Sequence, residues 1–454
     1  MASARDVARK VLDRVERDGA FAAAALESEA ATLKDKRDSS LATELVLGVL
    51  RRRPWLDRLL DSASSGGSLR KLDVTVRNIL RIGVYQIAYL DRIPVRAAVF
   101  EAVSSVKRSG TPRLSGLVNA LLRNLAAREP DALRPPADDD GASVEELALR
   151  YGLPGWLLTR LIDDRGTKEA LGIARVFNDR SARTMRVNTS RITRVDLLKR
   201  LSDSASPGPC LPWSINVSDR RDGRTIEEEG LAAYQDEGAG LVVAALDPKP
   251  GSKVLDACAG RGGKTGTIAM LLGDRAEITA ADRSRSKLDR AAFELNRQGF
   301  SANTVVVDLQ AGKGALEGPF DRILLDAPCS GTGTLGRRPE IRWRLSPDQV
   351  ASLVSVQRAM LDNVAPLVIE GGRLVYTVCS ILKEEGEKQI ERFLEEHPGF
   401  EPVHDPPSTW PDSIPWRSGL PFIDPSAHGT DGYFIACLGR RFPGCQKRSR
   451  RLKT

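Results

Sequence analysis

The sequence predicts a multidomain protein: an all-α helical bundle, then a small α+β segment, then an α/β domain with a Rossmann-like sheet. Three observations support this order. Residues 1–128 carry apolar side chains at helical spacing, residues 128–143 are rich in proline and acidic residues, and from about residue 231 short apolar runs alternate with helical stretches. A chain of 454 residues is long enough to bury several separate cores.

The N-terminal part, residues 1–128, has the pattern of a helix bundle. Two segments show it best, VRNILRIGVYQIAYL from Val76 and LSGLVNALLRNL from Leu114. In both, apolar residues recur in steps of three and one, which places them along one side of a helix. Such stripes need partner helices to bury them, so we expect a compact helical domain here.

A linker is expected over residues 129–142, where the sequence reads EPDALRPPADDDGA. Ser143 followed by Glu146 then has the spacing of a capping box that opens a new helix. Residues 143–230 mix short helical and extended patterns, and we expect them to form the small α+β segment.

The α/β domain is expected over residues 231–440. Its apolar runs are SKVLDACAG, AEITAAD, NTVVVD, FDRILLDAPC, GRLVYTVCS and YFIACLGR, with helical stretches such as RSKLDRAAFELNRQG between most of them. This alternation is typical of a parallel sheet covered by helices on both faces. Ligands of such sheets bind at the carboxyl ends of the strands. We therefore expect the residues at those ends to converge on one crevice: Asp256, Asp282, Asp308, Asp326 and Cys379.

The loop CAGRGGKT at 258–265 follows a predicted strand and opens a predicted helix. It is not a phosphate-binding P-loop, because Cys258 stands where that motif needs glycine, and its glycines are wrongly spaced for a dinucleotide site. A methyl donor that contains a nucleoside fits better. The acid before the loop suits the amino-acid end of the donor, Asp282 suits a ribose, and Asp308 suits an adenine amino group. One Asp alone is more often a cap or turn residue, but three at successive strand ends favour the donor.

The bulk composition limits the partners and the compartment. The net charge of +8 favours a polyanion such as nucleic acid. The six cysteines include no CxxC pair, which argues against a zinc site and against a disulfide framework. The charged N-terminus is no secretory signal, and no apolar run is long enough for a membrane span. We expect a cytoplasmic protein with reduced thiols and no membrane contact.

Several motifs together resemble the RNA cytosine-C5 methyltransferase family. They are DACAGRGGKT, LLDAPCSGTG, YTVCSI and HGTDGYFIACL, with RVNTS and AYQDEGAG upstream. The segments VRNILRIGVYQIAYLDRIPVRAAVFEAV and GLVNALLRN are similar to the NusB-like helical domain of the branch that acts on bacterial 16S ribosomal RNA. The resemblance implies a NusB-like RNA-binding domain over 1–128, an RNA-recognition role for 143–230 and a class I methyltransferase domain over 231–440. It also implies S-adenosylmethionine as cofactor, 16S rRNA or a pre-ribosomal particle as partner, and a monomer without metal.

The resemblance also assigns the site residues. It implies that Cys379 adds to C6 of the cytosine, that Cys329 assists proton removal and product release, and that Asp326 contacts N3. C5 of cytosine is a poor nucleophile, and a thiolate added at C6 makes it reactive while an acid serves N3. The residues expected to hold the donor are Cys258, Ala259, Gly260, Arg261, Gly262, Gly263, Lys264, Asp282, Asp308 and Asp326. The chain departs from the family at Gly260-Arg261, where Ala-Pro is usual, and at Val378, where Thr is usual.

Basic residues are expected to line the path of the RNA. Arg337, Arg338, Arg342 and Arg344 surround Trp343, a combination that suits phosphate contacts beside a stacking surface, although a solvated charged face has the same pattern. The tail 441–454 is expected to be a disordered basic arm that adds salt-sensitive affinity for RNA.

Three other functions remain open. The substrate could be tRNA rather than rRNA. The chain could also be a catalytically silent RNA-binding or assembly factor built on the NusB-like bundle. An amino-group methyltransferase is a poorer match, because such sites use Asn/Asp-Pro-Pro-aromatic where this chain has Asp326-Ala-Pro-Cys.

Overall fold

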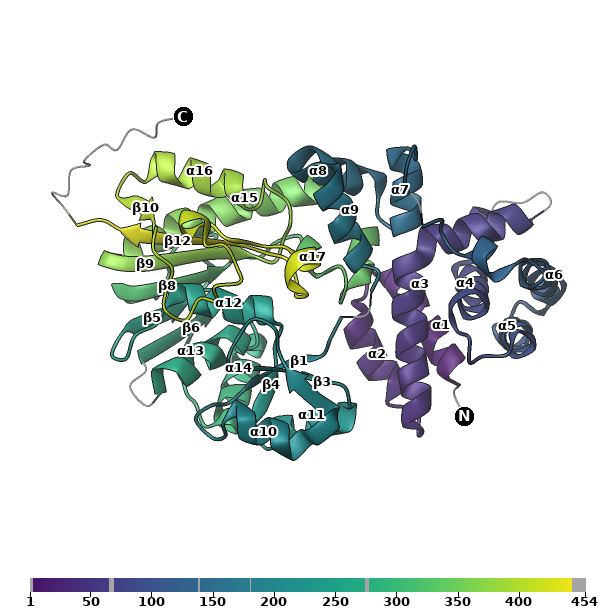
Figure 1. Cartoon of the computed structure of the whole chain (residues 1–454), viewed down its shortest axis with the longest axis horizontal. Helices are drawn as coiled ribbons and strands as arrows, with labels where there is room; N and C mark the ends of the chain where they lie inside the picture. Colours follow the sequence, from purple (N-terminus) through teal and green to yellow (C-terminus); the bar gives the residue numbers. More distant parts are fainter. Residues whose placement is uncertain (1–2, 65–68, 138, 180, 274–276, 443–454) are drawn as a thin grey trace. The chain divides into compact units, whose positions relative to one another are not determined.

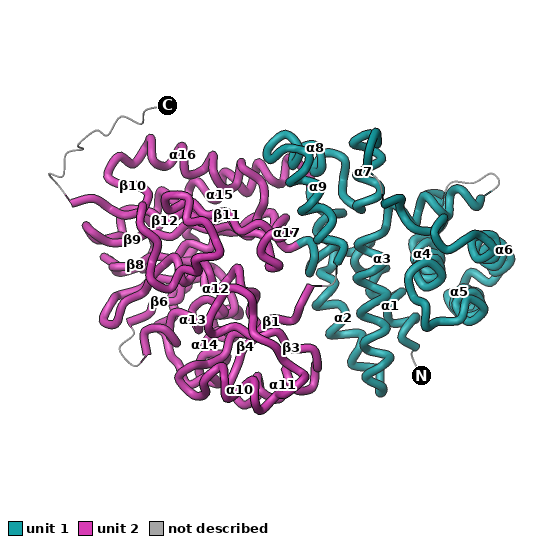
Figure 2. Tube along the Cα trace, viewed as in Figure 1, with its two compact units in different colours: residues 1–180, 335–345 teal, residues 181–334, 346–454 magenta. Residues whose placement is uncertain are grey.

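The computed structural model describes residues 3–64, 69–137, 139–179, 181–273 and 277–442. The expected basic arm at 441–454 therefore lies almost wholly outside the described residues. The chain forms two compact units: residues 1–180 with 335–345, and residues 181–334 with 346–454 (Figure 2). The division at 180/181 falls inside the range 143–230 that the sequence suggested as one α+β segment.

The described residues of the first unit form helices and their connecting turns. Its α-helices in the described residues are α1 (Ala4–Asp18), α2 (Ala22–Ala30), α3 (Lys36–Ala63), α4 (Val74–Tyr89), α5 (Val95–Arg108), α6 (Ser115–Ala126), α7 (Val144–Tyr151), α8 (Gly155–Arg165) and α9 (Thr167–Val176). The two predicted apolar stripes lie on α4 and α6, and most of each stripe is buried: Ile79 and Leu80 on α4 and Leu122 and Leu125 on α6 are at most 2% exposed. Leu117 on α6 is the exception, since it is 38% exposed. The helix start predicted at Ser143 is also confirmed, since its hydroxyl accepts a bond from the Glu146 N–H.

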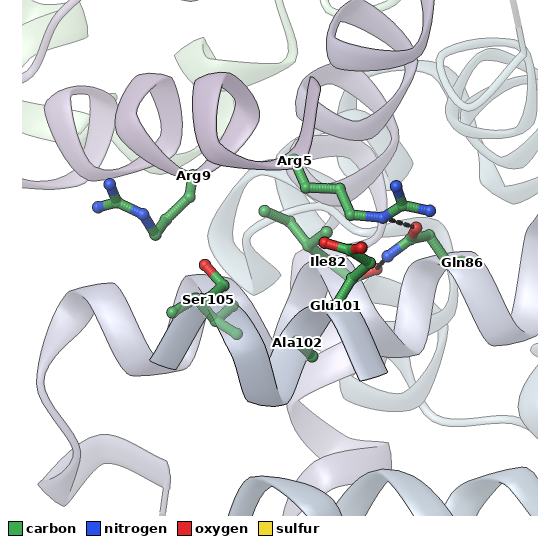
Figure 3. A pocket seen from close by; sticks show the side chains of 8 residues that line it. Arg5, Arg9, Ile82, Gln86, Glu101, Ala102 and Ser105 are labelled. Carbon is green, nitrogen blue, oxygen red and sulfur yellow. Dashed lines mark hydrogen bonds between the residues drawn. The ribbon is translucent and has the colours of Figure 1, made fainter. Parts of the chain in front are cut away.

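A small pocket opens on this unit beside α1, α4 and α5, and Arg5 lies over it (Figure 3). The Arg5 Nε donates a 2.7 Å hydrogen bond to Gln86 Oε1, and Gln86 in turn donates to the Ile82 carbonyl. Gln86 is 1% exposed, so this bond satisfies a buried amide and ties α1 to α4.

The segment 335–345 belongs to the helical unit, and it overturns part of the predicted RNA surface. Arg342 is 1% exposed and donates to the carbonyls of Phe177 at 2.6 Å, Gly152 at 3.1 Å and Arg51 at 3.2 Å. The Trp343 indole N–H donates to the Leu50 carbonyl at 2.9 Å. The expectation that Arg342 contacts phosphate is therefore wrong, because its guanidinium is buried and donates hydrogen bonds to backbone carbonyl oxygens.

The second unit begins with a small antiparallel sheet of order β2-β3-β1-β4. Its elements are β1 (Thr184–Val187), α10 (Arg194–Leu201), β2 (Ala205–Pro207), β3 (Ser214–Val217), α11 (Arg220–Glu228) and β4 (Ala232–Tyr234). Buried apolar side chains from the strands and both helices share one core. Only the part of the predicted α+β segment after residue 180 has this architecture, because residues 144–176 form helices α7 to α9 of the first unit.

The large sheet follows, with described strands in the order β7-β6-β5-β8-β9-β12-β10 and β11 paired to β12. Its elements are α12 (Glu237–Leu246), β5 (Lys253–Asp256), α13 (Gly263–Leu272), β6 (Glu277–Asp282), α14 (Arg285–Gln298), β7 (Asn303–Val306), β8 (Phe320–Asp326), α15 (Pro347–Val364), β9 (Val368–Val378), α16 (Glu387–Glu396), β10 (Phe400–Pro402), β11 (Phe422–Ile423), α17 (Pro425–His428) and β12 (Tyr433–Arg440).

The strands from β5 to β9 are parallel, as predicted, but β12 runs antiparallel to both β9 and β10. The expected parallel arrangement therefore does not extend to this edge of the sheet. The chain reaches the edge strand β10 through α16 and then returns into the gap beside β9, and a strand laid down on such a return runs in the opposite direction.

Alternation along the strands builds two cores, one on each face of the sheet (Figure 1). Leu255, Ile323 and Leu374 pack with residues of α15 and α16, whereas their neighbours Val254 and Leu324 pack with α12 and α13. The predicted fold class is therefore confirmed. Among the described residues, no helix combines the length and apolar character that crossing a membrane requires.

Candidate functional site

Cys329 and Cys379 lie at the carboxyl ends of two neighbouring parallel strands. Cys379 directly follows β9, and Cys329 follows β8 after Ala-Pro. Strands β8 and β9 pair in register, with Asp326 opposite Thr377. The two Sγ atoms stand 3.4 Å apart, and both side chains are half-buried. The structure thus brings together the two thiols that the sequence singled out.

The two thiols affect each other's ionisation. The contact with Cys379, together with burial, raises the pKa of Cys329 well above its usual value. A second negative charge at this distance is unfavourable, so the pair resists losing its second proton. Cys329 is the partner that retains its proton.

Lys264 supplies a cation beside this pair. Burial lowers the pKa of Lys264, but the Asp326 carboxylate and the nearby Cys379 sulfur outweigh burial and raise it. Its Nζ lies 2.6 Å from Asp326 Oδ2 and 5.4 Å from the centre of the Tyr433 ring. The sequence placed Lys264 in the glycine loop and carried no signal that its ammonium would also face Asp326 and the thiols.

Asp256 lies at the end of β5, and only one of its two carboxylate oxygens has a hydrogen-bond partner among the described residues. Its Oδ2 accepts a 2.7 Å bond from Thr265 Oγ1, but Oδ1 is buried and has no hydrogen-bond partner among the described residues. Burial raises the pKa of Asp256 to about 6. A buried acceptor without a partner is costly, and a ligand N–H or ammonium group would satisfy it.

The glycines of the loop have two different tasks. A Cβ at Gly262, where φ is +82°, would lie 3.0 Å from the Ala291 Cβ, so glycine is needed there to pack α13 against α14. At Gly260 and Gly263 the nearest atom to an added Cβ would be 4.0 Å away. The backbone at these two positions therefore borders open space, where a ligand can approach it closely.

Other residues predicted to bind the methyl donor lie along the same carboxyl edge of the large sheet. Asp282 ends β6 and is 7% exposed, and its Oδ2 accepts a 3.1 Å bond from the Gly260 N–H. Asp308 is exposed just beyond β7, and its Oδ1 accepts a bond from the Gln310 N–H, the arrangement of an ordinary turn residue. Burial raises the pKa of the Cys258 thiol well above its usual value, which disfavours a thiolate at this position.

Sequence reasoning missed the residues that hold the two cysteine loops together. Glu385 is fully buried and bonds to the residues that follow both cysteines. Gly333 packs closely against Gly432. The Gly333 N–H donates a hydrogen bond to the Cys379 carbonyl, and the Gly333 carbonyl accepts one from the Gly432 N–H. Nothing in the run ILKEEGEK distinguished Glu385 from the acids around it, and only the tertiary contacts do so.

One further group of side chains has the spacing of a metal site. Ligand atoms of Asp362, Glu396 and His397 lie within 4.8 Å of one another. Arg392 forms ion pairs with both carboxylates, so a cation already balances their charge. This cluster gives no reason to propose a metal.

Comparison with known proteins covers nearly the whole chain. Residues 243–439 match the model of the 16S rRNA methyltransferase RsmB/F, residues 2–127 match the NusB family, and residues 153–222 match the ferredoxin-like domain of RsmF/B-like methyltransferases. The probable ribosomal RNA small subunit methyltransferase B of Synechocystis sp. is 34% identical over 96% of this chain and 99% of its own length. The corresponding Bacillus subtilis protein is 33% identical over 97% and 99%.

Two solved structures agree with this result. The protein PH0851 is 26% identical, with a TM-score of 0.78 over 97% of this chain and 99% of its own. A methyltransferase homolog from Pyrococcus horikoshii is 28% identical, with a TM-score of 0.56 over 66% of this chain and all of its own. With a NusB-like helical part, a ferredoxin-like segment and a methyltransferase domain in one chain, and relatives that align from end to end, this protein belongs to the RsmB/F family of 16S rRNA methyltransferases.

Proposed function

We propose that the chain is an S-adenosylmethionine-dependent RNA cytosine-C5 methyltransferase that acts on 16S rRNA through a covalent bond from Cys379 to C6. The observation that carries this proposal is the pair of Sγ atoms of Cys329 and Cys379, 3.4 Å apart. Asp326 and its partner Lys264 lie at the same edge of the sheet. Methyl transfer to an amino group of the base would not require two adjacent thiols.

The donor fits the groups around the glycine loop. Asp256 Oδ1 is a buried acceptor in need of a partner, which suits the donor's ammonium group. Gly260 and Gly263 leave the backbone open to close approach, and Asp282 lies at the next strand end for the ribose hydroxyls. We assign Cys258, Ala259, Gly260, Arg261, Gly262, Gly263, Lys264, Asp282, Asp308 and Asp326 to this site. When bound, S-adenosylmethionine supplies an electrophilic methyl group.

The first step uses Cys379, Lys264 and Asp326. The Cys379 thiolate adds to C6, and the electron pair of the C5–C6 double bond becomes available at C5 as a proton is delivered at N3. The Lys264 ammonium favours the thiolate before the addition, because an opposite charge nearby stabilises the ionised form. Asp326 contacts N3 and passes it this proton, which comes from the Lys264 ammonium group 2.6 Å away.

The second step uses Cys329. After C5 has taken the methyl group, the C5 proton must leave and the bond from Cys379 to C6 must break. The contact with Cys379 is the largest cause of the raised pKa of Cys329. Once the Cys379 sulfur is bonded to carbon it carries no negative charge, so Cys329 can release its own proton to solvent and then accept the C5 proton. In the elimination the C6–S bond breaks, the C5–C6 double bond re-forms, N3 returns its proton to Asp326, and the electron pair goes back to the Cys379 sulfur.

RNA recognition is assigned to the rest of the chain. The matches to the NusB family and to the ferredoxin-like domain, and the names of the full-length relatives, favour small-subunit rRNA over tRNA. The net charge of +8 suits this partner.

The test measures cytosine methylation of a 16S transcript by the wild type, Cys379→Ala and Cys329→Ala, with Cys210→Ala as a control thiol outside the pair. Cys379→Ala should lose activity, Cys329→Ala should accumulate a covalent protein–RNA adduct, and Cys210→Ala should behave as wild type. Full activity of Cys379→Ala contradicts the mechanism. Calorimetry with S-adenosylmethionine separates the enzyme from a silent assembly factor, which would not bind it.

A further inference from the structure

Glu385 lies in the turn between β9 and α16, and its carboxylate is completely buried. Four donors converge on it. Oε1 accepts from the Ser330 N–H at 2.8 Å and from Gln357 Nε2 at 2.9 Å. Oε2 accepts from the hydroxyls of Ser330 at 2.5 Å and Ser380 at 2.6 Å. The carboxylate is therefore fully bonded, and three of its four bonds go to the cysteine loops.

The position of these partners in the chain is what matters. Ser330 is the residue after Cys329, and Ser380 is the residue after Cys379. One carboxylate thus fixes both loops directly behind the two thiols. Further bonds join the same loops: Thr332 Oγ1 lies 2.9 Å from Ser380 Oγ, and the Gly333 N–H donates to the Cys379 carbonyl at 3.0 Å.

Glu385 is itself held on the frame of the domain. The Tyr376 hydroxyl, from within β9, donates a 2.6 Å bond to the Glu385 carbonyl. Gln357 on α15 shares its amide between Glu385 and the Pro328 carbonyl at 3.0 Å. The carboxylate is therefore fixed relative to a central strand and a packed helix, so it can transmit a defined position to both loops.

We propose that Glu385 is a positioning residue that sets the spacing of the Cys329 and Cys379 sulfurs, and so allows one thiol to attack and the other to release the product. This inference rests on the proposed function for its catalytic meaning. It assigns the effect to hydrogen bonds and not to charge. A glutamine at 385 can keep its oxygen toward the Ser330 N–H while its NH₂ donates to the two serine hydroxyls, which can turn to accept.

The test compares Glu385→Ala and Glu385→Gln in the full chain. The control is Gln389→Ala, which removes a buried side chain bonded to Gln357 and the Val354 carbonyl but to neither cysteine loop. The first readout needs no RNA. It is the rate of Cys329–Cys379 disulfide formation with diamide, which takes up the two electrons and two protons, followed by mass spectrometry. The second is single-turnover methylation with KM for RNA and the donor Kd.

Glu385→Ala should slow disulfide formation about tenfold, because the sulfurs must come from 3.4 Å to the covalent distance of about 2 Å. It should lower kcat about 100-fold, the usual cost of a misplacement near 1 Å, with KM and donor Kd within twofold of wild type. Glu385→Gln should stay within about threefold of wild type in both readouts, and Gln389→Ala should do the same.

Two results overturn the inference: Glu385→Ala behaving like Gln389→Ala in both readouts, or Glu385→Gln being as impaired as Glu385→Ala, which would make the charge essential. If Glu385→Ala does not fold, Ser380→Ala removes one of the four bonds and should give a smaller slowing, whereas an unchanged disulfide rate refutes the proposal. Failure of wild type to methylate cytosine C5 would defeat the proposed function alone, because the disulfide rate still reports the spacing.

Discussion

Gly333 offers a sharp test of how tightly the Cys329 loop must be held. A Cβ at this position would lie 2.0 Å from the Gly432 carbonyl oxygen and 3.0 Å from the Gly432 Cα. Real Cβ atoms essentially never come closer than 3.0 Å to another heavy atom, so Gly333→Ala must push the two segments apart by at least about 1 Å. The shift strains two backbone bonds, Gly333 N–H to the Cys379 carbonyl at 3.0 Å and Gly432 N–H to the Gly333 carbonyl at 2.8 Å.

A displacement of this size at the reacting thiols should lower kcat about 100-fold, with a loss of about 1–3 kcal/mol in the free energy of unfolding. Methylation of a 16S transcript and urea denaturation measure the two effects. Gly399→Ala is the matched control, since an added Cβ there meets nothing within 4 Å. A folded Gly333→Ala protein with kcat within threefold of wild type would refute the reasoning that this close contact positions Cys329.

Three further predictions concern single charged side chains. Arg342→Met should lower the free energy of unfolding by about 2–4 kcal/mol in urea denaturation, because buried carbonyls lose their donor, whereas the exposed Arg344→Met should change it by less than about 1 kcal/mol. Burial raises the pKa of Asp256 to about 6, above its value in the unfolded chain, so calorimetry should show donor binding about tenfold tighter at pH 7 than at pH 5, and Asp256→Asn should remove this dependence. Lys264→Met removes the cation near Cys379, so the pH at which iodoacetamide alkylation of that thiol reaches half its maximum rate should rise by about one unit; an unchanged profile would show that Lys264 does not favour the thiolate.

The sequence was sufficient where a pattern is local. The stripe in α4 and the alternating runs of β5, β6, β8 and β9 depend on residue spacing alone, and their positions agree with the structure. The carboxyl-edge residues could also be found, because parallel strands end on the same side of a sheet. The adjacency of Cys329 and Cys379 follows from β8 and β9 being neighbours, which the sequence order permitted but did not require.

The sequence was insufficient where a feature depends on contacts between residues that are distant in the chain. The run GRRPEIRW has the composition of a basic, aromatic surface, yet Arg342 lies against the carbonyls of α3, Gly152 and Phe177, which no local pattern reveals. Lys264 and Glu385 likewise owe their roles to partners that are distant in sequence or on another loop. The reversed direction of β12 depends on where the chain re-enters the sheet.

The path of residues 335–345 also affects how the nascent chain can mature. The oxygens of Arg51, Gly152 and Phe177 leave the ribosome long before Arg342, the residue that satisfies them. An N-terminal fragment that stops at residue 180 would keep those oxygens without their guanidinium, so the helical part reaches its final state only after Arg342 has been made. Translation therefore has to pass residue 345 before the helical unit holds all of its residues.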